Sequence, residues 1–94
     1  MIVVRETFTA KPGCASKLAA QMKAAMEAVL PGRSRVLTDL VGPFNTVVIE
    51  TTAESMGQFE EELTRLMTDP VLRSHMQGYT DLYVTGRREA YRVV

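Results

Sequence analysis

The chain has 94 residues, 46% of them hydrophobic, and its 11 basic residues balance 11 acidic ones. This length predicts a single domain over residues 1–94, of a size that hides only about 60 to 65% of the surface its unfolded chain exposes, so that association would stabilise it. The charge balance argues against nucleic acid or acidic lipid as a partner, because no long-range field would attract phosphate groups.

Residues 2–9 are rich in β-branched side chains and predict a strand that lies centrally in a sheet. The alternation of the strand places two sets of residues on opposite faces: Ile2, Val4, Glu6 and Phe8 on one, and Val3, Arg5 and Thr7 on the other. One acidic residue therefore shares a face with three apolar ones.

A helix is predicted over residues 14–29, because large apolar side chains recur there at helical spacing and alanine fills the positions between them. Pro31 and Gly32 end it. A second strand is expected over residues 34–41 and a third over residues 46–52, and the short Gly42 to Asn45 link between them predicts an antiparallel hairpin.

A second helix begins at Ser55-Met56-Gly57-Gln58, which has the form of a capping box. The pattern predicts a buried stripe of Met56, Phe59, Leu63, Leu66 and Met67, and a solvated side of Glu60, Glu61, Glu62 and Arg65. Asp69-Pro70 predicts a break and a fresh helix start, followed by a short segment to about Gln77. Gly78 ends that segment, and a last strand is expected over residues 81–92, with Gly86 as a bulge or bend.

The order strand, helix, strand, strand, helix, strand predicts an α+β, ferredoxin-like βαββαβ fold. We expect a four-stranded antiparallel sheet with both helices on one face, the first and third strands parallel in its middle and the second and fourth at its edges. The other face of the sheet is then uncovered.

That bare face predicts a homodimer. Val3 and Val48 would lie on it, and a sheet with apolar groups on both sides needs two coverings. Arg5 and Glu50 are expected to pair there across neighbouring strands. The apolar end Tyr91, Val93 and Val94 extends the last strand, which could add to the partner's sheet. The alternative is a monomer in which polar neighbours dilute the exposed patch.

The element order resembles that of the dimeric α/β-barrel superfamily, and within it the NIPSNAP-like branch. The resemblance is carried by KPGCASKL at residues 11–18, GPFNTVVIET at 42–51, ESMGQFEEEL at 54–63 and GRREAYRV at 86–93. It implies two sheets that close into a barrel across a dimer, with a pocket between sheet and helices in each subunit. Relatives by fold include cofactor-independent monooxygenases of antibiotic biosynthesis and haem-degrading enzymes; the latter rely on a tryptophan, and this chain has none.

Glu6 is the best candidate for catalysis, as a general acid or base or a ligand anchor, since a carboxylate in an apolar layer has a raised pKa unless it is paired. The alternative is an ion pair. His75, the one histidine, is a second catalytic candidate as a proton shuttle or haem ligand, and its alternative is a solvated residue at a helix end.

Phe8, Tyr79 and Tyr83 are candidate ligand-binding residues, because aromatic rings can line a pocket and a hydroxyl can orient a polar ligand. Core packing is the alternative for both tyrosines. The methionines of the helices predict adaptable packing and could also bound a hydrophobic ligand. Cys14 is interpreted as a small residue that begins a helix, without a redox partner.

Several classes of function are disfavoured. One histidine and one cysteine do not form a usual zinc site, and the chain has neither a phosphate-binding glycine loop nor a nucleophile elbow, so no metal or cofactor is expected. Apolar runs of at most four residues and a start without a signal peptide predict a soluble, cytoplasmic protein. Two hypotheses remain. One is a dimer that binds a hydrophobic or aromatic small molecule and could act on it as a cofactor-independent monooxygenase. The other is a non-catalytic binding or scaffold dimer.

Overall fold

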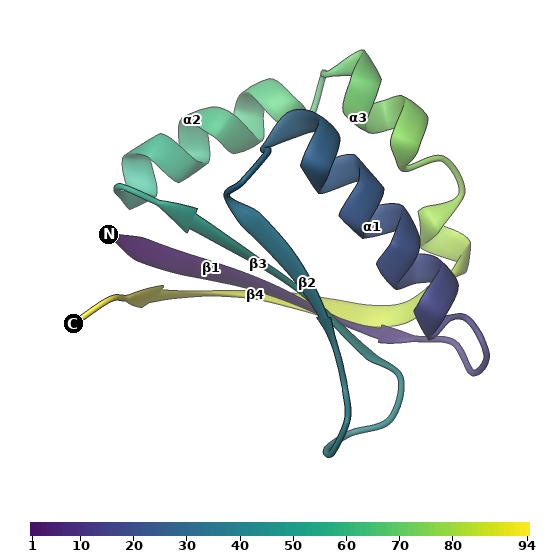
Figure 1. Cartoon of the computed structure of the whole chain (residues 1–94). Helices are drawn as coiled ribbons and strands as arrows, with labels where there is room; N and C mark the ends of the chain where they lie inside the picture. The colour runs from purple at the N-terminus through teal and green to yellow at the C-terminus, as the bar shows by residue number, and fades with distance from the viewer.

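The computed structural model describes all 94 residues, as four strands, three α-helices and one short 3₁₀ helix (Figure 1). In chain order they are β1 (Ile2–Ala10), α1 (Ala15–Val29), β2 (Ser34–Thr38), β3 (Thr46–Ala53), α2 (Met56–Leu66), α3 (Pro70–His75), the 3₁₀ helix Tyr79–Asp81, and β4 (Tyr83–Arg92). No helix combines the length and the apolar composition needed to cross a membrane.

The strands form one sheet in the order β2-β3-β1-β4, and the three helices all lie on one face of it (Figure 1). The ferredoxin-like α+β architecture is therefore confirmed. One expectation is wrong: β1 and β3 are antiparallel, with Arg5 opposite Glu50. The hairpin explains the direction. The crossover through α1 sets β2 parallel to β1, and β3 reverses direction before it enters the gap between them.

The predicted alternation of faces is confirmed on β3, where every second residue is buried against the helices. Val47 is 0% exposed and lies in a core cluster with Leu18 and Met22 of α1. A second, smaller cluster joins Val4, Ala53 and Phe59. The core thus lies in the layer between sheet and helices, and the opposite face of the sheet is open.

Both capping motifs that the sequence predicts, at Ser55 and at Asp69, form their hydrogen bonds. Ser55 Oγ accepts from the backbone N–H of Gln58 at 3.1 Å, and Gln58 reaches back to the N–H of Glu54. Asp69 Oδ1 accepts from the backbone N–H of Val71 at 2.8 Å and so begins α3. The predicted break between α2 and α3 is confirmed.

Two strand features differ from expectation. β2 ends at Thr38 instead of residue 41, because Asp39 Oδ1 accepts from the N–H of Thr46 and begins a wider loop. Gly86 is paired regularly with Phe8, and the register shift lies at the neighbouring Val84. The glycine serves a close approach instead, since a Cβ there would lie 3.0 Å from Cδ1 of Phe8.

The buried stripe of α2 is shorter than predicted. Phe59 and Leu66 are buried, whereas Met56 is 43% and Met67 73% exposed, because they stand at the ends of the helix, beyond its packed central turns. Glu62, expected on the solvated side, is turned inward by a partner from another element, and its side chain is only 12% exposed.

Candidate functional site

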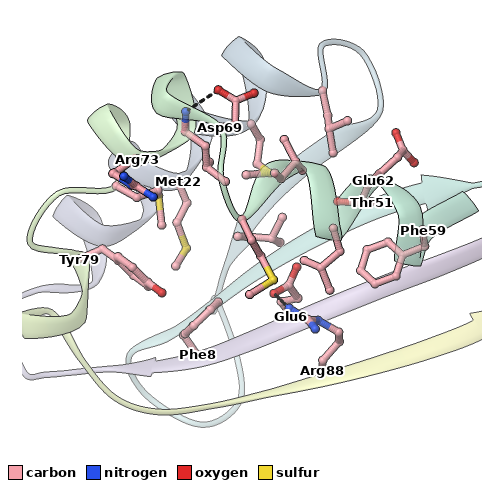
Figure 2. A pocket seen from close by; sticks show the side chains of 18 of the residues that line it. Glu6, Phe8, Met22, Thr51, Phe59, Glu62, Asp69, Arg73, Tyr79 and Arg88 are labelled. Carbon is pink, nitrogen blue, oxygen red and sulfur yellow. Dashed lines mark hydrogen bonds and ion pairs between the residues drawn. The ribbon is translucent and has the colours of Figure 1, made fainter.

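A pocket of about 580 Å³ lies between the sheet and the helices (Figure 2). Of the 19 residues that line it, 12 are hydrophobic. They come from every helix and from three strands: Glu6, Phe8, Met22, Met26, Leu30, Ile49, Thr51, Phe59, Glu62, Leu63, Leu66, Met67, Asp69, Leu72, Arg73, Met76, Gln77, Tyr79 and Arg88. The volume suits a small organic molecule.

Aromatic rings form a row beside this pocket. Phe8 meets Tyr83 edge to face, with ring centroids 5.0 Å apart, and Tyr83 stacks on Tyr79 at 5.7 Å. Phe8 and Tyr79 line the pocket, while Tyr83 supports both from behind and packs against the core. The three aromatic candidates thus lie together, two of them as lining residues.

Glu6 faces the pocket from the sheet, as the alternation of β1 predicts, and it is paired. Arg88, its neighbour on β4, donates from Nη2 to Glu6 Oε2 at 2.9 Å. The same guanidinium lies over the ring of Phe59, 5.7 Å from its centroid. The two opposite charges of this pair compensate each other on the sheet side of a mainly apolar pocket.

A second ion pair closes the other side of the pocket. Glu62 of α2 accepts from both Nη atoms of Arg33, and Arg33 also donates to the backbone carbonyl of Thr52 at 2.8 Å. The hydrogen bonds from Arg33 are the main reason that the pKa of Glu62 lies below its ordinary value of 4.5. This link ties α2 to the sheet.

Tyr79 presents a phenol at one end of the pocket (Figure 2). Burial raises its pKa, and the neighbouring Tyr83 and the Glu6 carboxylate raise it further. At neutral pH the hydroxyl therefore keeps its proton and can donate a hydrogen bond to a ligand.

His75 does not join this group. It is exposed at the end of α3 and is not among the lining residues, and its backbone carbonyl accepts a hydrogen bond from Gln21. Cys14 precedes α1 half-buried and makes no capping hydrogen bond. No group of three or more His, Cys, Asp or Glu side chains is placed to hold a metal ion.

The predicted pair of Arg5 and Glu50 is confirmed on the open face of the sheet, at 2.9 Å. Arg35 of β2 shares the same carboxylate at 2.7 Å, and both hydrogen bonds lower the pKa of Glu50. This cluster lies on the opposite side of the sheet from the pocket and belongs to a different surface.

The sequence pattern does not single out the arginines of the site. Arg88 could be found only from the register of β4 against β1, across 82 residues of sequence. Arg73 had a weaker signal, its position four residues after Asp69 at the start of a short helix. Glu62 was assigned to the solvated side because it is charged, although its position three residues after Phe59 and four before Leu66 places it beside the buried stripe of α2.

No protein-family model matches this sequence, and no curated protein does either. Solved structures do match. A NIPSNAP-like domain protein from Burkholderia xenovorans aligns with 99% of this chain and 84% of its own, at TM-score 0.84 and 20% identity. A NIPSNAP family protein with unknown function from Agrobacterium tumefaciens aligns with 97% of this chain and 86% of its own, at TM-score 0.80 and 22% identity.

A putative antibiotic biosynthesis monooxygenase from Chloroflexus aurantiacus also shares the arrangement, over 99% of this chain and 92% of its own, at TM-score 0.73 and 17% identity. At these identities the comparisons show a shared fold and no more. The chain has the ferredoxin-like fold of the NIPSNAP and antibiotic-monooxygenase structures, as its sequence motifs indicate.

Proposed function

We propose that the protein binds a small, mainly apolar molecule in the pocket between its sheet and helices. The observation that carries this proposal is the cavity itself, about 580 Å³ with a lining that is two-thirds hydrophobic and holds a few ionic groups. Protein interiors are normally close-packed, and each void weakens the fold. A scaffold whose residues served only packing would have little reason to keep this space open.

Filling the pocket tests the proposal. Leu63→Trp places an indole into the cavity from α2, whereas Glu61→Trp places one on the exposed side of the same helix. We expect the first variant to lower the affinity for an apolar fluorescent probe, phenylnaphthylamine, at least tenfold, and the second to leave it unchanged. Mass spectrometry of molecules that co-purify with the native protein would identify the natural ligand.

Because an added indole could disturb the fold, circular dichroism and thermal unfolding accompany both variants. Met67→Trp offers a second way to fill the space, since this side chain lies exposed at the pocket and its replacement leaves the buried core intact. If both filled variants fold and still bind the probe as the unchanged chain does, the pocket is not the binding site.

We also propose that the open face of the sheet is covered by a second copy of this chain. Leu37, Val48 and Tyr91 give that face apolar area, and its charges have both signs, with Arg5 beside Glu50 and Arg87 beside Glu89. Such a mixed surface is complementary to itself across a two-fold axis.

The β2–β3 loop supports the same arrangement. It projects beyond the sheet on the side away from the helices (Figure 1). Leu40, Val41 and Phe44 in this loop are 98%, 99% and 85% exposed, which is a costly arrangement for an isolated chain. A second copy on the open face would lie within reach of these side chains.

The reaction that we favour for the pocket is oxidation of a bound substrate by O₂ without a cofactor, as in a cofactor-independent monooxygenase. One structure with this fold is described as a putative antibiotic biosynthesis monooxygenase, and the pocket holds a carboxylate and a protonated phenol in an apolar setting. Glu6 would accept a proton from an activated CH₂ group, and Tyr79 would donate to the oxygen on which charge develops. With O₂ as oxidant the CH₂ group becomes C=O, and the second oxygen atom leaves as water.

Glu6→Gln tests this chemistry. With anthrone, a tricyclic ketone whose acidic CH₂ group is oxidised to a carbonyl, we expect the protein to accelerate oxygen uptake and the variant to lose about 10²-fold or more of that rate. Binding of phenylnaphthylamine should persist, because the side chain keeps its shape. Equal oxygen uptake by both proteins would remove Glu6 from the chemistry while leaving the binding proposal in place.

A further inference from the structure

The polar groups of the pocket divide into two sets, and the carboxylates of the first set already have hydrogen-bond partners within the protein. Glu6 is paired with Arg88, and Glu62 with Arg33. Asp69 accepts hydrogen bonds from the first backbone N–H groups of α3 through its carboxylate. A ligand gains little binding energy from these carboxylates, since each already accepts hydrogen bonds from an arginine or from backbone N–H groups.

The second set consists of Arg73, Gln77 and Tyr79, which line the pocket and take part in no ion pair. Arg73 of α3 takes part in none of the ion pairs of the structure. Gln77, four residues on, accepts a hydrogen bond only through its backbone carbonyl, which leaves its amide free. Figure 2 shows Arg73 and Tyr79 at the same end, with Phe59 and Thr51 at the opposite one.

All three side chains at this end can donate hydrogen bonds. A guanidinium donates two parallel hydrogen bonds to a planar oxyanion, and it does so more strongly beside apolar surface than in open water. The amide of Gln77 adds a neutral donor. The phenol of Tyr79 keeps its proton, because its pKa is raised by burial. Asp69, the lining carboxylate without an ion pair, accepts from backbone N–H groups and forms no ion pair with Arg73, so the guanidinium keeps all its donors for a ligand.

We propose that the natural ligand is an apolar oxyanion: an acid, a carboxylate foremost, on an aromatic or aliphatic body. The anionic head binds Arg73, Gln77 and Tyr79, and the body lies over Phe8 and the methionines of α1. This assignment rests on the proposed function of the pocket and names the class of ligand that it takes.

A purely structural role for Arg73 makes a different prediction. Arg73 stands in the last turn of α3, where a cation also complements the helix dipole. If Arg73 had only that role, Arg73→Gln would be less stable to heat or urea. The ratio of the affinities for two ligands that differ only in charge would not change.

The test uses two probes with the same ring system, anilinonaphthalene sulfonate, which carries an oxyanion, and phenylnaphthylamine, which does not. We expect the protein to bind the sulfonate more tightly. Arg73→Gln should lower the ratio of the two affinities about tenfold, and Tyr79→Phe should lower it by a smaller factor. The control Lys17→Gln removes one positive charge from an exposed site away from the pocket and should leave the ratio unchanged.

The two proposals fail in different ways. If Leu63→Trp blocks both probes but Arg73→Gln leaves their ratio as it was, the pocket binds ligands and the oxyanion assignment is wrong. If Leu63→Trp and Met67→Trp block neither probe, the pocket is not a binding site and both proposals fall. If Lys17→Gln lowers the ratio as much as Arg73→Gln does, the preference comes from overall charge and the assignment to this end of the pocket is overturned.

Discussion

Charged side chains at the border of the buried layer are held in place by partners of opposite charge. Glu62 shows this most clearly: it stands three residues after Phe59 and four before Leu66, beside the buried stripe of α2, and Arg33 holds it against the edge of the pocket. Arg33 also holds the carbonyl of Thr52, so that one guanidinium joins the chain before β2, the end of β3 and the middle of α2. The position of the pocket wall depends on this side chain.

We predict that Glu62→Gln lowers the free energy of unfolding by about 1.5 to 3 kcal/mol at neutral pH, the range for hydrogen bonds to a charged group. The pKa of Glu62 is lowered in the folded state from 4.5, chiefly by hydrogen bonds from Arg33, so the ionised form favours folding. Its contribution is present above pH 4.5 and is lost as the pH falls through the lower, folded pKa. Urea unfolding at pH 7, 5 and 3 measures this dependence.

The expected pattern is a gap between the native chain and Glu62→Gln that stays constant from pH 7 to pH 5 and closes toward pH 3. Glu60→Gln is the matched control, two residues earlier on the exposed side of α2 and outside every ion pair. A gap that persists undiminished at pH 3 would mean that the variant is weakened by something other than the lost charge.

At the scale of elements, local chemistry decides what can be predicted from the sequence. The order of strands and helices follows from periodicity, and the break at Asp69-Pro70 follows from the capping carboxylate and the proline, both of which act within a few residues. The same holds for Ser55 and Gln58. These features need no knowledge of the rest of the chain.

Features that depend on distant pairing were missed. The partner of Glu6 is Arg88, and finding it requires the register of β4, which the irregularity at Val84 shifts by one residue. The direction of β3 against β1 was misjudged for a related reason, since the expected parallel pairing contradicts the reversal that the hairpin imposes. The face of β1 that carries Glu6 and Phe8 was predicted because alternation is local, and so was the pair of Arg5 and Glu50, whereas the partners of Glu6 and Glu62 were not identified.

At the scale of the whole molecule, the two faces of the sheet differ in shape and chemistry, and we assign a separate function to each. The helix side holds the pocket, whose 19 lining residues all come from one chain. The open side carries the apolar and ionic surface that we assign to a second copy. The two functions should therefore be separable by substitution.

Val48→Lys tests that separation. Val48 lies on the open face between Leu37 and Thr7, and a lysine there would lose its hydration when two sheets meet, which costs several kcal/mol without a partner of opposite charge. We expect the unchanged chain to be a dimer at micromolar concentration by sedimentation or light scattering, and the variant to be a monomer or an aggregate. Val71→Lys, on an exposed site of α3 that does not line the pocket, should remain dimeric.

The variant also answers a question about the pocket, because a folded Val48→Lys monomer should still bind phenylnaphthylamine with the affinity of the unchanged chain. A monomer that has lost the probe would show that the second copy helps to hold the helices in place over the sheet. A well-behaved dimer of Val48→Lys, or a solitary native chain at micromolar concentration, would leave the open face without the assigned partner and would require another cover for Leu40, Val41 and Phe44.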